Sequence, residues 1–157
     1  MCSIGYSASS FLATDEDTTA VGKAMAPLLT AGDVLLFFGP IGAGKTHLAR
    51  AIIQTRLTVP EDVPSPTYTL VQTYRTAESE IWHADLYRLC DSSEVEELGL
   101  LDAFDTAIVL IEWPDRLAVP PADALQVTLT PQDGGRRIDF ASSNPRWERL
   151  RDALAHV

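Results

Sequence analysis

The chain has 157 residues, a mass of 17.1 kDa, 46% hydrophobic residues and 22% charged residues. This size suits a single folded domain, and the composition excludes long disorder as well as collagen-like and coiled-coil classes. The net charge of −10 disfavours solo binding to nucleic acid, because an acidic surface repels the phosphate backbone. We therefore expect one soluble domain over residues 1–157.

Cysteine content and apolar run length indicate the cellular compartment. Cys2 and Cys90 are too few for a disulfide framework, and neither lies in a metal-binding motif. The longest apolar runs, VLLFF and AIVLI, are much shorter than a membrane-spanning helix. The sequence therefore predicts a cytoplasmic protein with reduced thiols and no membrane association.

The first predicted element is an amphipathic helix that is capped by Thr14 and ends at Gly32. The apolar run Val34–Phe38 follows, and it is too short for a helix and apolar on both faces. These two properties are typical of a central parallel strand. A glycine-rich segment over 39–44 ends this strand, and helical spacing resumes over 45–57.

The second half of the chain alternates shorter elements. Two prolines precede a β-rich segment, and the sequence PQDGG separates two further β-rich segments as in a hairpin. The predicted elements are strands at 67–74 and 80–87, an acidic helix at 92–99, a buried strand at 107–111, hairpin strands at 124–130 and 136–142, and a helix at 145–155.

The segment after the first strand matches the phosphate-binding pattern G-x-x-x-x-G-K-S/T. Its residues are Gly39, Pro40, Ile41, Gly42, Ala43, Gly44, Lys45 and Thr46. The pattern lies between a buried strand and a helix, where the backbone N–H groups and the helix N-terminus attract phosphate. Lys45 would contact the β- and γ-phosphates of ATP, and the Thr46 hydroxyl would bind Mg²⁺. We therefore expect a P-loop NTPase-like α/β fold: a mixed sheet with a mostly parallel core, flanking helices and an antiparallel C-terminal hairpin.

A P-loop enzyme also needs a carboxylate that orders the metal ion, and two candidates end apolar segments. Glu112 follows five buried residues, which favours a metal-binding role over a surface position. Asp85 is two residues from His83, so both side chains would share one face of a strand. That pair would orient water or metal-bound water, or else form only a structural hydrogen bond.

A loop and an aromatic residue are further candidates for the site. Ser65, Thr67 and Thr69 lie where nucleotide switches have a γ-phosphate-sensing loop, although a plain proline-stiffened loop also fits. Trp113 would lie at the lip of the site. The segment 90–115 holds eight carboxylates and no Lys or Arg, which fits a solvated face or a docking surface for a basic partner.

Five segments together resemble the TsaE (YjeE) family of small bacterial P-loop ATPases: GPIGAGKT, SPTYTLV, HADLYRL, ELGL and IEWPDRL. The resemblance runs from about Thr18 to the GGRR turn and is specific in the order and spacing of these segments. The first eleven residues and the terminal helix carry little of it. A typical family member has a charged or small residue where this chain has Pro40.

The resemblance implies a partner-activated, Mg²⁺-dependent ATPase in threonylcarbamoyladenosine formation on the tRNA adenosine beside the anticodon. It implies a TsaD–TsaB complex as partner, multiple turnover driven by ATP hydrolysis, and contact with tRNA only through the partners. Carried over by position, Lys45, Asp85 and Glu112 would be catalytic, and Thr46 and Glu112 would bind the metal ion. Thr18 and Arg136 match positions near the base or ribose.

Two other functions fit the same P-loop. A small-molecule or nucleoside kinase would use it, but such enzymes carry an arginine-bearing lid, and between Arg56 and Leu117 the only arginines are the scattered Arg75, Arg88 and Arg116. A nucleotide-gated binding module with negligible hydrolysis is the third possibility. Measuring phosphate release with and without partners would distinguish them.

Overall fold

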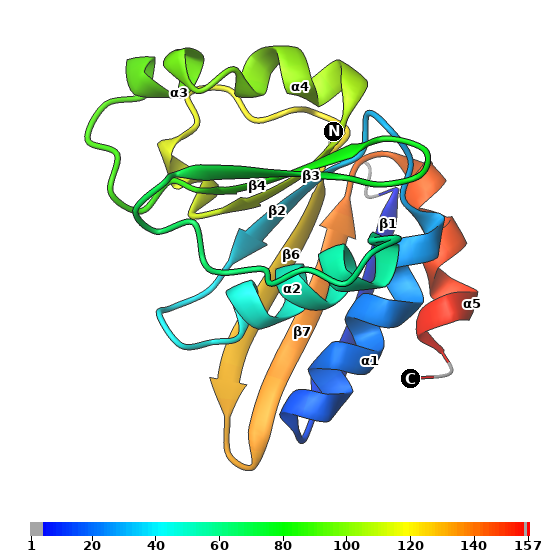
Figure 1. The fold of residues 1–157 in the computed structure, drawn as a ribbon. Helices are drawn as coiled ribbons and strands as arrows, with labels where there is room; N and C mark the ends of the chain where they lie inside the picture. Colours follow the sequence, from blue (N-terminus) through cyan, green and yellow to red (C-terminus); the bar gives the residue numbers. More distant parts are fainter. Residues whose placement is uncertain (1–4, 156) are drawn as a thin grey trace.

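The computed structural model describes residues 5–155 and 157, so Cys2 lies outside the described residues. These residues form a seven-stranded sheet with the order β1-β7-β6-β2-β5-β4-β3 (Figure 1). Its strands are β1 (Tyr6–Leu12), β2 (Val34–Phe38), β3 (Val71–Arg75), β4 (Glu80–Asp85), β5 (Ile108–Glu112), β6 (Leu125–Gln132) and β7 (Gly135–Ser142).

The middle of this sheet is parallel and both of its sides are antiparallel. Strand β2 pairs in parallel with β5 and β6, and β5 pairs in parallel with β4. Antiparallel pairing joins β3 to β4, β6 to β7, and β7 to β1. The predicted mixed sheet, its parallel core and its C-terminal hairpin are confirmed.

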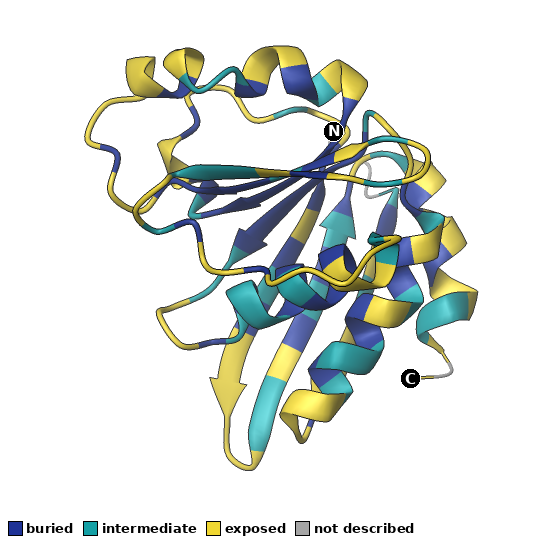
Figure 2. Cartoon of the chain, viewed as in Figure 1, coloured by how far each residue is buried: buried dark blue, intermediate teal, exposed yellow. Residues whose placement is uncertain are grey.

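Helices cover both faces of the sheet (Figure 1). Helices α1 (Asp15–Met25) and α2 (Lys45–Arg56) pack on one face around buried residues such as Leu48 and Leu110. Helices α3 (Ser93–Glu97) and α4 (Leu100–Thr106) pack on the other face with Val109. Figure 2 shows the central strands as mostly buried and the outer helix surfaces as exposed.

The C-terminal segment, which consists of a 3₁₀ helix (Pro145–Arg149) and α5 (Leu150–Leu154), is held to the start of β2 by ion pairs. Asp33, which is fully buried, lies 3.0 Å from a guanidinium nitrogen of Arg146 and 2.6 Å from one of Arg149. A buried carboxylate requires such partners because desolvation of an unpaired charge is costly. Of the helix predicted at 145–155, the first part is a 3₁₀ helix over Pro145–Arg149, and the α-helix extends only over Leu150–Leu154.

Strand β1 is absent from the prediction, which left residues 1–11 unassigned. The segment Tyr6–Leu12 contains three serines, and only its end residues Tyr6 and Leu12 are buried. Its backbone nevertheless pairs with β7 along its whole length. Backbone hydrogen bonds to an existing edge, which do not depend on side-chain pattern, stabilise this strand.

Several predicted boundaries are wrong, and the strand predicted at 80–87, for example, ends at Asp85. The first helix is capped by Thr14 as expected, but it ends at Met25 and continues only as a 3₁₀ turn through Pro27, because proline lacks the N–H that an α-helix needs. The predicted strand at 67–74 begins only at Val71, after a tight turn. The acidic helix ends before Gly99, and the unpredicted α4 follows it at once.

Two further observations concern membrane-spanning helices and cysteines. No helix among the described residues is long and apolar enough to cross a membrane. Cys90 is exposed and forms no disulfide within the described part of the chain.

Candidate functional site

A cleft of about 550 Å³ lies where the parallel strands β2, β4 and β5 end at their carboxyl sides. Ligands of open α/β sheets bind at this edge, where the loops after parallel strands meet. The lining residues come from six parts of the chain: Asp15, Ile41, Gly42, Gly44, Lys45, Thr46, His47, Ser65, Thr67, Asp85, Tyr87, Glu112, Trp113 and Arg136.

The loop between β2 and α2 forms one wall of this cleft. Gly39 and Gly44 have φ angles of 144° and 109°, which side-chain-bearing residues rarely adopt. A side chain at position 44 would also collide with the guanidinium of Arg136. The loop thus turns directly into the N-terminus of α2, where backbone N–H groups without intrahelical partners favour an anion.

Lys45 lies almost wholly inside the cleft, with 5% of its surface exposed. Its ammonium donates a hydrogen bond to the Gly39 carbonyl and lies 3.5 Å from the centre of the Trp113 ring. Burial lowers the pKa of Lys45 below its ordinary value, and the nearby Glu112 and Asp85 carboxylates oppose part of this effect. The cation is therefore held beside the loop at 39–44 by contacts that an anion could replace.

The Glu112 carboxylate accepts one hydrogen bond at each oxygen. The Thr46 hydroxyl donates to Oε1 at 2.8 Å, and the His83 ring contacts Oε2 through Nε2 at 2.7 Å. Glu112 is 2% exposed, so these donors compensate much of the loss of water around its charge. Thr46 and Glu112, the two residues that the family resemblance assigns to metal binding, therefore lie in direct contact.

Asp85 lies beside Glu112, because the two residues are paired in the register of β4 and β5. It is 5% exposed, and its Oδ1 accepts a hydrogen bond of 3.0 Å from the Tyr87 backbone N–H. Burial raises the pKa of Asp85, the Tyr87 N–H acts in the opposite direction, and the Glu112 charge raises it further. The expected hydrogen bond between His83 and Asp85 is not found among the described residues: the ring of His83 contacts Glu112 instead.

The donor set of the cleft suits a hard divalent cation. Hydroxyl and carboxylate oxygens such as those of Thr46 and Glu112 are the ligands that Mg²⁺ prefers, and Mg²⁺ normally completes its shell with phosphate and water. No cluster of three or more His, Cys, Asp or Glu residues able to hold a metal exists among residues 5–155 and 157. The residues present thus fit an ion that is bound together with a nucleotide.

The loop over 65–70 forms the opposite wall. The Leu70 N–H donates to the Pro66 carbonyl at 2.7 Å, and Leu70 has a φ of 69°. This closes a tight turn where the sequence analysis placed the start of a strand. Ser65 and Thr67 share a hydrogen bond of 2.7 Å, and Thr67 lies 3.5 Å from Asp85 Oδ2. The turn thereby directs two hydroxyls into the cleft.

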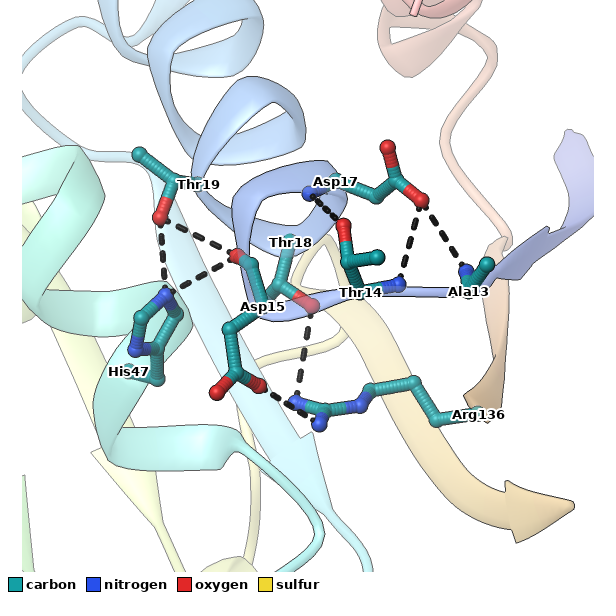
Figure 3. A network of polar contacts seen from close by, with 8 residues as sticks. All are labelled: Ala13, Thr14, Asp15, Asp17, Thr18, Thr19, His47 and Arg136. Atoms are coloured by element: carbon teal, nitrogen blue, oxygen red, sulfur yellow. Dashed lines mark hydrogen bonds and ion pairs between the residues drawn. The ribbon is translucent and has the colours of Figure 1, made fainter. Parts of the chain in front are cut away.

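Arg136, on β7, forms the wall beside the N-terminus of α1 (Figure 3). Its guanidinium pairs with Asp15 at 2.7 Å and reaches the Thr18 hydroxyl at 3.5 Å. Thr18 is fully buried and lies behind Arg136, outside the described residues that line the cleft. The structure therefore brings both residues together, and their contact with a base or ribose stays a prediction.

His47 connects α2 to the N-terminus of α1 (Figure 3). Its Nε2 lies 2.7 Å from the Thr19 hydroxyl and 3.1 Å from the Asp15 carbonyl. The sequence analysis did not single out this residue. The Thr14 and Asp17 side chains form a capping box at the same helix end. The His47 contacts join this end of α1 to the helix that follows the loop at 39–44.

Comparison with known proteins gives the family. The family model described as "Threonylcarbamoyl adenosine biosynthesis protein TsaE" matches residues 12–138. The chain belongs to the TsaE family.

Several curated TsaE proteins are similar to this chain. The tRNA threonylcarbamoyladenosine biosynthesis protein TsaE of Rickettsia felis is 36% identical over 91% of this chain and 84% of its own length. The proteins of the same name from Nostoc sp. and Haemophilus influenzae are 38% and 39% identical, over 81% and 75% of this chain and 80% and 75% of their own lengths.

A solved structure shares the fold. Bacillus subtilis YdiB has a TM-score of 0.77 and 26% sequence identity, and the alignment covers 98% of this chain and 97% of that one. This similarity includes β1 and the C-terminal segment, which the TsaE family match leaves out.

Some cleft residues of this TsaE protein were not predicted. Asp15, His47 and Tyr87 line the cleft. Asp15 and His47 lie outside the five segments that carry the family resemblance. Tyr87 belongs to one of these segments, HADLYRL, two residues after the β4 carboxylate Asp85, but no role was assigned to it.

Proposed function

We propose that this TsaE protein is a Mg²⁺-dependent ATPase that supports threonylcarbamoyladenosine formation on tRNA, together with a TsaD–TsaB-like complex. One observation carries the ATPase part: Thr46, at the start of the P-loop helix, contacts Glu112 at the end of a neighbouring parallel strand at 2.8 Å. This brings a phosphate-binding loop and a carboxylate together as P-loop NTPases require. Family membership supports the tRNA-modification part.

The loop at 39–44 would bind the phosphates of ATP through its backbone N–H groups and the N-terminus of α2. Lys45 would leave the Gly39 carbonyl and the Trp113 ring to neutralise the β- and γ-phosphates. Arg136 and Thr18 would lie near the base or ribose. The fully buried position of Thr18 gives it a supporting place behind Arg136.

Thr46 and Glu112 would hold Mg²⁺, which supplies charge neutralisation at the phosphates when it is bound. Glu112 would exchange its contact with the Thr46 hydroxyl for a shared contact with the ion. Asp85, whose pKa is raised by burial, would orient water next to this position. Its backbone partner Tyr87 and its neighbour Thr67 fix the carboxylate for that role.

A partner protein would complete the site. Among the described residues that line the cleft, Arg136 is the one arginine, and Asp15 already pairs with it. An arginine that stabilises the transferring phosphoryl group contributes about 10³- to 10⁵-fold in rate, so hydrolysis by this chain alone should be slow. The cleft rim exposes Tyr68 at 85% and Ile41 at 73%, which suits a contact with another protein.

The tRNA would be held mainly by the partner complex. The net charge of −10 opposes direct binding of a phosphate backbone by this chain. ATP hydrolysis would then allow repeated turnover by the complex, in the cytoplasm.

The decisive experiment measures phosphate release by the purified protein alone, with a TsaD–TsaB complex, and with tRNA added. We expect slow release alone and stimulation by the complex. Trp113→Ala and the double variant Ser65→Ala/Thr67→Ala should weaken the stimulation, whereas Ser143→Ala, at a residue that directly follows β7 and is not among those lining the cleft, should not.

Two outcomes would point elsewhere. Full hydrolysis alone, unchanged by the complex, would favour an independent hydrolase or a small-molecule kinase. Nucleotide-dependent binding to the complex without phosphate release would favour a nucleotide-gated binding module.

A further inference from the structure

His83 is a fully buried ionisable residue to which the proposed function assigns no role. It lies on β4, two residues before Asp85, and its ring faces the carboxylate at the end of β5. Nε2 is 2.7 Å from Glu112 Oε2, and the side chains of both residues are almost fully buried, at 0% and 3% exposed. The contact is therefore shielded from water and is strengthened by the low local dielectric.

The geometry determines which ring nitrogen donates. A carboxylate oxygen only accepts, so the proton of this hydrogen bond lies on His83 Nε2. The other ring nitrogen, Nδ1, is buried and has no hydrogen-bond partner among the described residues. A buried ring nitrogen that lacks a partner costs less free energy without a proton than a buried N–H group without an acceptor would. The ring therefore has a single polar function here, which is to donate to Glu112.

The two carboxylate oxygens of Glu112 have different surroundings: one is held in place, and the other can exchange its partner. Oε2 is held by His83, whose strand is paired with β5. Oε1 faces Thr46 and the cleft. Without His83 the carboxylate could rotate about its terminal bond, and either oxygen could face the cleft.

We propose that His83 is a positioning residue that orients Glu112 for divalent metal binding in the presence of nucleotide. This inference rests on the proposed function, because it assigns the metal ion to Thr46 and Glu112. Partners of this kind behind a metal ligand typically contribute 10- to 100-fold in metal affinity. A role in packing alone would require only that the ring volume be filled.

The test uses paired substitutions and Mn²⁺ as the probe in place of Mg²⁺. His83→Gln keeps an N–H donor near the position of Nε2, whereas His83→Leu keeps much of the volume and removes the donor. Electron paramagnetic resonance would measure the affinity for Mn²⁺ in the presence of ADP. Calorimetry would measure ADP affinity without metal, and thermal melting would measure stability.

We expect His83→Leu to weaken Mn²⁺ affinity about 10- to 100-fold with metal-free ADP affinity unchanged, and His83→Gln to restore most of the loss. Unchanged Mn²⁺ affinity in His83→Leu, with only a lower melting temperature, would overturn the proposal. Failure of the unsubstituted protein to bind ADP would instead overturn the proposed function, and the inference with it.

A measurement on the unsubstituted protein covers the case in which His83→Leu does not fold. Long-range ¹H–¹⁵N correlation spectra distinguish the two ring tautomers of histidine. We expect His83 to carry its proton on Nε2, with Nδ1 bare. A proton on Nδ1 alone would contradict the contact with Glu112 and overturn the proposal.

Discussion

The ammonium group of Lys45 lies 3.5 Å from the centre of the Trp113 ring, and Trp113 has a φ of 59°, in the left-handed region. A tryptophan in this conformation is strained, and such strain is kept where the surrounding structure requires it. Trp113 also packs against Tyr87, with ring centres 4.8 Å apart. Lys45 is thus covered by Trp113, whose strained backbone conformation is supported by packing against Tyr87.

We expect Lys45→Ala to weaken ATP binding about 10- to 150-fold, which corresponds to about 1.5–3 kcal/mol for a lost charge-assisted contact. Isothermal titration calorimetry would measure the affinity, and circular dichroism would verify the fold. The exposed Lys23→Ala is the matched control and should bind ATP like the parent. Unchanged affinity in a folded Lys45→Ala would contradict the phosphate-binding role of the loop.

Glu112→Ala should reduce ATP hydrolysis more than it reduces nucleotide binding. The reason is that a metal ligand acts most on the charge that develops in the transition state, whereas the loop N–H groups hold the phosphates in the ground state. Single-turnover phosphate release and nucleotide affinity would be measured in parallel. Asp115→Ala, an exposed carboxylate nearby, should leave both near parental values. Parental hydrolysis by Glu112→Ala would move the metal role to Asp85.

Asp85→Asn should stabilise the nucleotide-free protein at pH 7. Because burial raises the pKa of Asp85 above its ordinary value of 3.8, the unfolded chain ionises first as pH rises, and the folded state loses stability. The gain in melting temperature should therefore shrink as pH falls toward 3.8 and disappear below it. Thermal melts from pH 3 to pH 8 would measure it. Asp62→Asn, an exposed carboxylate, should show no such dependence.

Thr14→Ala should lower the free energy of unfolding by about 1 kcal/mol, since it removes the hydrogen bond that the Thr14 hydroxyl accepts in the capping box at α1. This predicts a fall of about 2–4 °C in melting temperature. Thr14→Ser keeps the hydroxyl and should retain most of the stability. If serine and alanine lowered the melting temperature equally, the hydrogen bond to the Asp17 N–H would not be the stabilising contact.

Local sequence patterns were sufficient to place the loop at 39–44 and Glu112 at one edge of the sheet. Each depends on a short segment: a glycine-rich turn before a helix, and a carboxylate after a buried strand. The contact between Thr46 and Glu112 also follows, because neighbouring parallel strands end at one edge of the sheet. The parallel core and the C-terminal hairpin were predictable because an apolar run and the PQDGG turn are also short local patterns.

Contacts between strands that are far apart in the sequence could not be predicted from local patterns. His83 was assigned to Asp85 because they are close in sequence, but strand pairing places Glu112 nearer to its ring. Strand β1 has no clear alternation, and its pairing with β7 depends on backbone groups that every residue carries. The turn that ends at Leu70 overrides the β propensity of 67–69, because the chain must close on Pro66 before it enters β3.

The pairing of β1 with β7 joins residues 6–12 to residues 136–142. During synthesis β1 leaves the ribosome long before its partner β7 exists. It therefore stays unpaired while the loop at 39–44, Asp85 and Glu112 emerge. A nascent chain released after β5 would contain Lys45 and Glu112 but would lack Arg136 and the hairpin that seats it. Because pairing across so many residues is slow, completion of the cleft should be among the last events in the maturation of the newly made protein.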